Sequence, residues 1–89
     1  MFTLKMTGQF KKDLKRIQNN PKKIEHLRAV LTSLKETGVV PESYYPPKLT
    51  GNYSGFMECH VESDLLLIWL DEEENIIKLV RLGSHSELF

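Results

Sequence analysis

Two stretches in the first half of the chain carry apolar residues at helical spacing, which is typical of amphipathic helices. The apolar positions are Phe10, Leu14 and Ile17 in the first stretch and Ile24, Leu27, Val30, Leu31 and Leu34 in the second. Thr7 is suited to cap the first helix, and Asn20 followed by Pro21 is suited to begin the second. Gly38 fits the end of the second helix. We therefore predict a helical hairpin with one apolar side to bury.

The second half of the chain changes to strand patterning. Residues 53–61, 65–70 and 76–82 are predicted strands, and the middle one is apolar enough to be buried on both faces. The turns between them are short, which favours antiparallel neighbours. A short opening strand is expected within residues 1–6. The proline-containing stretch that follows the second helix reads as a loop with a brief strand near residues 48–49.

Side chains alternate along the first of these three strands. Met57, Cys59 and Val61 share one apolar face, whereas Glu58 and His60 share the other. The predicted architecture is a single α+β domain over residues 1–89, with the helical hairpin packed on one face of a small antiparallel sheet. The apolar residues of this strand would face the helices. Glu58 and His60 would then lie on a second face that is open to solvent.

Composition narrows the class of protein. The 89 residues suffice for one small core, and the single cysteine excludes an intramolecular disulfide, which suggests a reducing, cytoplasmic location. The start of the chain lacks a signal-peptide pattern, and the longest apolar run is too short to span a bilayer. Residues 1–50 carry a net charge of +6 and residues 51–89 carry −6. A basic half suits a polyanion or an acidic protein as partner, although a solvated helical face explains the same charge equally well.

Two histidines and an arginine are the candidates for chemistry. His60 and His85 can supply a general base and a general acid near neutral pH, or they can be ordinary hydrogen-bonding side chains. Arg81 lies in an apolar strand and needs a partner, either a phosphate or a structural carboxylate such as Glu58 or Asp64. Glu58, Asp64 and the two histidines are also potential metal ligands, but their spacing matches no standard zinc pattern, so metal binding is disfavoured.

Other conspicuous residues have plainer interpretations. Cys59 alternates onto the core side and reads as a buried small hydrophobe, not a nucleophile. Trp69 and Phe56 read as packing residues. Three tyrosines lie near the loop, namely Tyr44, Tyr45 and Tyr53. They either stack on an unpaired base or cover the edge of the core.

The strings LTGNYSGFMECHVESDLLLIW (49–69) and LVRLGSHSELF (79–89) together resemble the YafQ branch of the RelE superfamily of bacterial toxins. The segment FKKDLKR (10–16) also resembles that branch, so the similarity extends over essentially the whole chain. The resemblance implies a toxin of a type II toxin–antitoxin pair with two N-terminal helices against a curved antiparallel sheet. It implies an endoribonuclease that cuts mRNA, typically in the ribosomal A site, without a cofactor or metal.

Functional residues carried over by position from this resemblance are His60, Asp64, Arg81, His85 and Phe89, with Glu58 a weaker member. RNA cleavage without a metal needs a base for the 2′-OH proton, an acid for the leaving 5′-oxygen and a cation for the phosphorane. We expect His85 to be the acid, with Asp64 or His60 in the base or orienting role. Arg81 would stabilise the phosphate and Phe89 would help to place a base.

The sequence departs from the family pattern at one place. The family usually carries Asp-His shortly before the L-x-G segment, whereas this chain has Pro46-Pro47 there. One catalytic candidate is therefore missing. Lys48 or one of the nearby tyrosines could compensate electrostatically. The alternative to an active enzyme is a member that keeps the fold and partner contacts but has weak or no cleavage activity.

The positive charge of the first half of the chain is consistent with this hypothesis. Seven cations are expected to track ribosomal RNA phosphates, namely Lys11, Lys12, Lys15, Arg16, Lys22, Lys23 and Lys48. The same positive surface would suit an acidic segment of a cognate antitoxin that orders on binding. The expected partners are therefore mRNA, the ribosome and the antitoxin, with no membrane. The free protein would be a monomer and the neutralised one a hetero-oligomer.

Overall fold

A computed structural model of the chain describes residues 1–44, 48–49 and 56–88. The elements are β1 (Thr3–Met6), α1 (Gly8–Ile17), α2 (Pro21–Thr37), the short 3-10 helix η1 (Glu42–Tyr44), β2 (Lys48–Leu49), β3 (Met57–Glu62), β4 (Leu65–Glu72), β5 (Ile76–Gly83) and α3 (His85–Leu88). The two predicted helices, the brief β2 and the three predicted C-terminal strands are thus present. β4 runs two residues further than expected. The part of the first predicted strand that precedes residue 56 lies outside the described residues.

The strands form one sheet in the order β1-β5-β4-β3-β2, with five strands in the described part of the chain. The β2–β3, β3–β4 and β4–β5 pairs are antiparallel, as predicted. β1 pairs with β5 in parallel and thus differs from the purely antiparallel sheet expected from the short turns. A parallel neighbour requires a long connection, and here most of the chain, including the helical hairpin, separates the two strands.

The helix boundaries follow the predicted capping residues. The Thr7 side chain accepts a hydrogen bond of 3.0 Å from the Phe10 N–H. The Asn20 side chain accepts one of 3.2 Å from the Lys23 N–H at the start of α2. Gly38 ends α2 in the left-handed conformation with φ of 77°, and its N–H donates to the Leu34 carbonyl. These caps satisfy backbone groups that a helix end leaves without partners.

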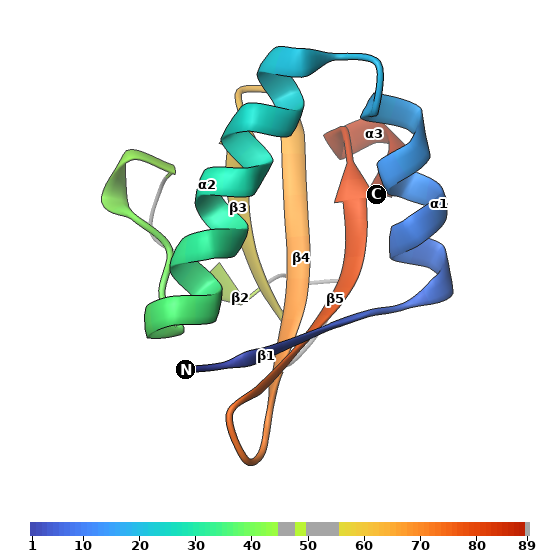
Figure 1. Cartoon of the computed structure of the whole chain (residues 1–89). Helices are drawn as coiled ribbons and strands as arrows, with labels where there is room; N and C mark the ends of the chain where they lie inside the picture. Colours follow the sequence, from blue (N-terminus) through green and yellow to red (C-terminus); the bar gives the residue numbers. More distant parts are fainter. Residues whose placement is uncertain (45–47, 50–55, 89) are drawn as a thin grey trace.

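Both long helices cover the same face of the sheet, with α2 in front of β3 and β4 and α1 beside β5 (Figure 1). The main core lies between these layers and includes Phe10, Leu34, Cys59, Val61 and Trp69. Met57 packs against the same core, so the predicted orientation of the first C-terminal strand is confirmed. No helix among the described residues is long and apolar enough to cross a membrane.

The opposite face of the sheet is not simply open to solvent, and that part of the prediction was wrong. Leu66, Ile68 and Leu88 form a second, smaller apolar cluster there, with Phe56 and Val80 packed against it. The short helix α3 supplies Leu88 to this cluster. The cluster exists because β4 is apolar at consecutive positions, so each of its faces needs cover.

Candidate functional site

The sheet register brings the predicted catalytic residues to one end of the fold. His60 on β3 pairs with Leu66 on β4, and Leu66 pairs with Gly83 on β5, two residues before His85. Because neighbouring strands lie about 4.8 Å apart, His60 and the end of β5 are separated by roughly 10 Å across the sheet. Glu58 occupies the adjacent row, opposite Ile68, which in turn pairs with Arg81. The register therefore places Glu58 and His60 on β3 and Arg81 on β5, on either side of β4, with His85 just beyond β5.

His60 borders a hollow of about 430 Å³ at the edge of the sheet. β2 pairs only with the first part of β3, so residues 59–62 form the edge strand there within the described chain. The hollow is also lined by Lys22, His26, Tyr44 and Glu62. Its far wall is held by a polar contact, since the His26 Nδ1 lies 2.9 Å from a Glu62 carboxylate oxygen.

Asp64 borders a second hollow, of about 370 Å³, on the other side of the β3–β4 turn. Asp64 is exposed in that turn. Arg16, Lys23, Ser84 and Glu87 are among the other lining residues, and they come from α1, α2 and the segment after β5. This hollow therefore lies between the C-terminal segment that carries His85 and the junction of α1 and α2, which we call the helix junction.

Three of the seven predicted RNA-binding cations border these two hollows. Arg16 and Lys23 line the hollow beside Asp64, and Lys22 lines the hollow beside His60. The exposed residues Lys11, Lys12 and Lys15 lie elsewhere on α1. The side chain of Lys48 lies outside the described part of the structure. The cations at the helix junction are thus the ones closest to the catalytic candidates.

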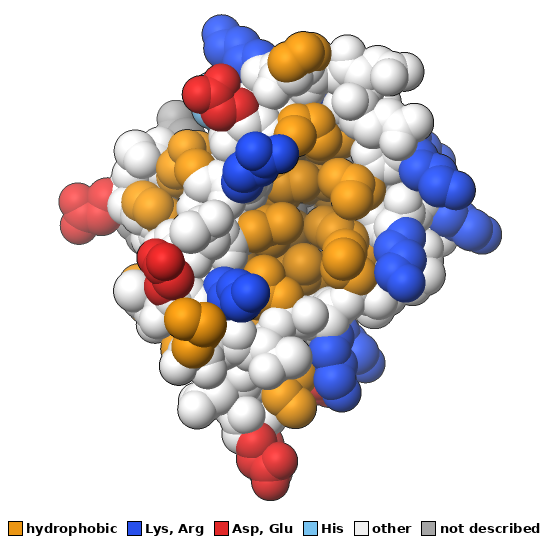
Figure 2. All heavy atoms as spheres, viewed as in Figure 1, with side chains coloured by type: hydrophobic (Ala, Val, Ile, Leu, Met, Phe, Trp, Pro, Cys, Tyr) orange, Lys and Arg blue, Asp and Glu red, His pale blue; other side chains and the backbone are white. Residues whose placement is uncertain are grey.

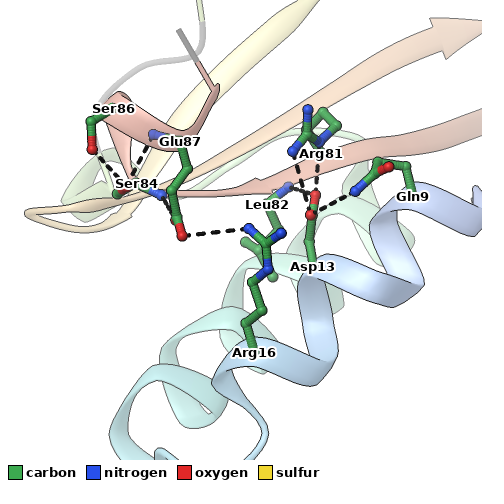
Figure 3. A network of polar contacts seen from close by, with 8 residues as sticks. All are labelled: Gln9, Asp13, Arg16, Arg81, Leu82, Ser84, Ser86 and Glu87. Carbon is green, nitrogen blue, oxygen red and sulfur yellow. Dashed lines mark hydrogen bonds and ion pairs between the residues drawn. The ribbon is translucent and has the colours of Figure 1, made fainter.

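Arg81 has a structural partner that the sequence did not point to. Its Nε donates to Oδ2 of Asp13 at 2.9 Å, and its Nη2 donates to Oδ1 at 3.4 Å (Figure 3). The sequence left open a phosphate or a structural carboxylate such as Glu58 or Asp64, and the structure shows a structural carboxylate from a different residue, Asp13. A bulge at Val80 in the β4–β5 register leaves Arg81 opposite Ile68. Arg81 nevertheless reaches Asp13, because α1 packs along β5 beyond the end of β1.

Asp13 is a buried acid that serves several donors. Its Oδ2 also accepts the Leu82 N–H at 2.9 Å, and its Oδ1 accepts the Gln9 side chain at 3.1 Å. Burial alone would raise the pKa of Asp13, but the hydrogen bonds from Arg81, Leu82 and Gln9 outweigh it and hold that pKa below its ordinary value. Asp13 therefore remains a carboxylate and supports the edge of β5.

The helix that carries His85 begins with a capping box. The Ser84 N–H donates to Glu87 Oε1 at 2.8 Å, and the Glu87 N–H donates to Ser84 Oγ at 3.3 Å. These bonds lower the pKa of Glu87, and the Arg16 charge lowers it further. Arg16 Nη1 also reaches the second Glu87 oxygen at 3.4 Å (Figure 3). α3 is therefore fixed to α1, and His85 lies exposed at its first position.

Two of these supporting interactions had detectable signals in the sequence. Asp13 falls on the apolar stripe of α1, three residues after Phe10, where a charge needs a buried partner. The Ser84-x-x-Glu87 spacing is the signature of a capping box. The remaining predicted features lie outside the described residues and stay untested, namely Phe89, Pro46-Pro47, Tyr45 and Tyr53.

The interpretation of Cys59 and Trp69 as buried packing residues is confirmed by their low exposure. Cys59 is 1% exposed, and burial raises the pKa of its thiol to about 12 with a smaller contribution from Glu58. It is therefore not a nucleophile at neutral pH. Trp69 is 1% exposed in the main core. Across the described residues, no three His, Cys, Asp or Glu side chains gather so that they could hold a metal ion.

Residues 2–89 match the family described as "Bacterial toxin of type II toxin-antitoxin system, YafQ". A relative from Escherichia coli K12, named mRNA interferase toxin YafQ, is 31% identical over 87 residues, covering 97% of this chain and 94% of that protein. The toxin in the E. coli DinJ–YafQ complex superposes with a TM-score of 0.83 at 27% identity, covering 100% of this chain and 99% of that one. A metal-bound toxin from Helicobacter pylori gives a TM-score of 0.78 at 39% identity, with both chains covered in full. Because the family match spans almost every residue, the chain belongs to the YafQ family of toxins of bacterial type II toxin–antitoxin systems.

Proposed function

We propose that this protein is a ribosome-dependent endoribonuclease that cleaves mRNA in the ribosomal A site by metal-independent acid–base catalysis. The observation that supports the proposal is the sheet register, which places His60 on β3 and Arg81 on β5 on either side of β4, with Asp64 in the β3–β4 turn and His85 just beyond β5. Family membership supports the same activity, because a relative of this chain is named an mRNA interferase. The surrounding cations of the helix junction suit a polyanionic substrate.

The proposed reaction is attack of a ribose 2′-oxygen on the adjacent phosphorus. Asp64 or His60 takes the 2′-OH proton, and the P–O5′ bond breaks as His85 donates a proton to the leaving 5′-oxygen. The products are a 2′,3′-cyclic phosphate and a 5′-OH end. Arg81 stabilises the charge that develops on the phosphorane. Glu58 lies in the row next to His60 and is placed to orient the base, and Phe89 is proposed to place a nucleobase.

Mapping of cleavage sites on one mRNA, with and without translating ribosomes, tests this proposal. We expect cuts in codon register that require ribosomes and leave 5′-OH ends. His85→Ala should lose about 10²–10⁴-fold in cleavage rate, the usual contribution of a positioned general acid. Full cleavage by His85→Ala would exclude His85 from the chemistry.

The second candidate function is a binding module without cleavage activity. It is favoured by Pro46-Pro47, which replaces a family Asp-His pair in the sequence. The two functions separate when expression without antitoxin is compared for the wild type and His85→Ala. Growth arrest that depends on His85 supports the enzyme. Equal arrest by both proteins, without any RNA cuts, supports the binding module.

Ribosome binding is proposed to use phosphate contacts from the helix junction. Arg16, Lys22 and Lys23 border the two hollows of the candidate site. Each phosphate contact to RNA changes the slope of log affinity against log salt by about 0.7–0.9. Replacing all three with Gln should therefore make the slope shallower by about 2. An unchanged slope would mean that these side chains do not contact phosphate.

A different surface suits the antitoxin. The two helices and β1 enclose an apolar groove of about 310 Å³, visible as the depression in the centre of Figure 2. Its lining consists of Leu4, Leu14, Ile24, Leu27, Arg28, Leu31, Thr32 and Lys35. The lining residues include two cations and no acid. Successive residues of a helix are rotated by about 100°, so Lys11 and Lys15 lie beside Leu14 on the flank of α1 nearest this groove.

We propose that an acidic, amphipathic segment of the cognate antitoxin occupies this groove, because it complements both the apolar floor and the basic rim. Leu31→Asp places a charge on the floor and should weaken antitoxin binding at least tenfold by titration calorimetry. Lys35→Glu should weaken it mainly at low salt. Wild-type affinity in both variants would show that the antitoxin binds elsewhere.

A further inference from the structure

We propose that Asp13 is a positioning residue for Arg81, holding the guanidinium in the orientation that phosphate stabilisation requires. This inference rests on the cleavage reaction proposed above, in which Arg81 supports the phosphorane. Asp13 lies on α1, 68 residues away from Arg81 in sequence, and its buried side chain borders the hollow beside Asp64 from within the core. Its role would be to act through Arg81, without touching the substrate.

The contact between the two side chains fixes both the distance and the plane of the guanidinium. Nε and Nη2 of Arg81 meet Oδ2 and Oδ1 of Asp13 at 2.9 and 3.4 Å, so two parallel bonds join the groups edge to edge. A single ion-pair contact would leave the guanidinium free to swivel, whereas a two-point contact does not. The Arg81 side chain is 22% exposed and the Asp13 side chain is 0% exposed. The arginine thus extends from a buried anchor towards the surface (Figure 3).

The anchor itself is immobilised from other directions. Oδ2 of Asp13 accepts the Leu82 N–H at 2.9 Å, and Oδ1 accepts the amide of Gln9 at 3.1 Å. Asp13 also lies on the same helix face as Phe10, which is 0% exposed in the main core. These two further donors and the packed helix hold the carboxylate independently of Arg81. The pair is therefore positioned by the core of the fold.

The hydrogen bond that Asp13 accepts from the edge of β5 does not require a charged side chain. β1 pairs with β5 only as far as Leu79, so the Leu82 N–H lies beyond that pairing and is satisfied by Asp13. A neutral amide would serve that N–H equally well as an acceptor. Burying a carboxylate carries a large desolvation cost unless a cation is held against it. A carboxylate can form an ion pair with the guanidinium of Arg81, whereas an amide cannot.

Asp13→Asn isolates the positioning role, because asparagine retains an acceptor for the Leu82 N–H and has nearly the same volume. Asp71→Asn is the matched control, since it removes the same charge from an exposed site on β4. Cleavage of ribosome-bound mRNA is measured for both variants, for Arg81→Ala and for Asp13→Asn combined with Arg81→Ala. Unfolding in urea is measured alongside. Exchange protection of the Arg81 Nε–H by NMR reports the orientation independently of activity.

We expect Asp13→Asn to lower kcat by about 10²-fold, the effect of a displacement of about 1 Å at a reacting centre. KM should change by less than about threefold, because the interaction acts mainly in the transition state. Asp71→Asn should match the wild type. In the Arg81→Ala background, Asp13→Asn should change kcat by less than about twofold while recovering stability, since it removes an unpaired buried charge.

Two results would overturn the proposal. One is wild-type kcat in Asp13→Asn. The other is an equal loss of kcat on adding Asp13→Asn to Arg81→Ala, which would indicate a general structural role. If the wild type cleaves no RNA, the proposed function fails, and the NMR readout then decides the inference alone. Protection of the Arg81 Nε–H that is lost in Asp13→Asn supports the positioning, and protection unchanged between the two proteins refutes it.

Discussion

Gly38 ends α2 in a conformation that only glycine adopts without strain, and replacing it should destabilise the fold measurably. Its φ of 77° lies in the left-handed region, which costs a residue with a Cβ about 1–2 kcal/mol. A Cβ at this position would also lie 2.5 Å from Cζ and 2.7 Å from Cε1 of Phe2. Gly38→Ala therefore combines backbone strain with displacement of an aromatic ring.

The size of the second effect depends on how firmly Phe2 is held. Its N–H donates to the Lys35 carbonyl at 2.7 Å, and its ring packs against the main core. Moving a half-buried ring out of this contact forfeits about 1–2 kcal/mol of the burial energy of an aromatic side chain. The lower entropy of unfolded alanine returns about 0.4–1 kcal/mol. We expect Gly38→Ala to lower the free energy of unfolding by about 2–3 kcal/mol.

Urea denaturation monitored by circular dichroism measures this loss, and Gly8→Ala is the matched control. Nothing lies within 4 Å of a Cβ built at Gly8, which is the first residue of α1. That control should leave stability unchanged or raise it by a few tenths of a kcal/mol. Adding Phe2→Ala should reduce the cost of Gly38→Ala to the backbone part, about 1 kcal/mol. Equal stability of the two alanine variants would refute the reasoning on both strain and contact.

Two further predictions follow from the ionisable groups of the core. Because the pKa of Asp13 is held below its ordinary value of 3.8, its contribution to stability is complete above pH 3.8 and disappears as pH falls through the lower native pKa. The urea midpoint of the wild type should therefore fall more steeply than that of Asp13→Asn below this pH, and parallel curves would contradict the pairing with Arg81. Cys59, with a pKa of about 12, should resist alkylation in the native protein at pH 8 and react fully in urea, as mass spectrometry would show.

Much of the secondary structure was predictable because its determinants are local. Helical spacing with Thr7, Asn20 and Gly38 at the ends defined both long helices, since capping depends on a few neighbouring residues. Alternation likewise placed Cys59 on the core side and His60 on the other, because side chains in a strand alternate by geometry alone. The motif strings identified the candidate catalytic residues by resemblance to the family.

The sequence alone therefore determined the two long helices, the strands, the faces of β3 and the residues proposed for chemistry. Only the tertiary structure decided that β1 joins β5 in parallel, because such a pairing connects segments at opposite ends of the chain. It also decided that Arg81 pairs with Asp13, since the packing of α1 along β5 brings the two side chains within reach. Both results depend on contacts between distant residues, and no local pattern encodes which distant group satisfies a buried charge.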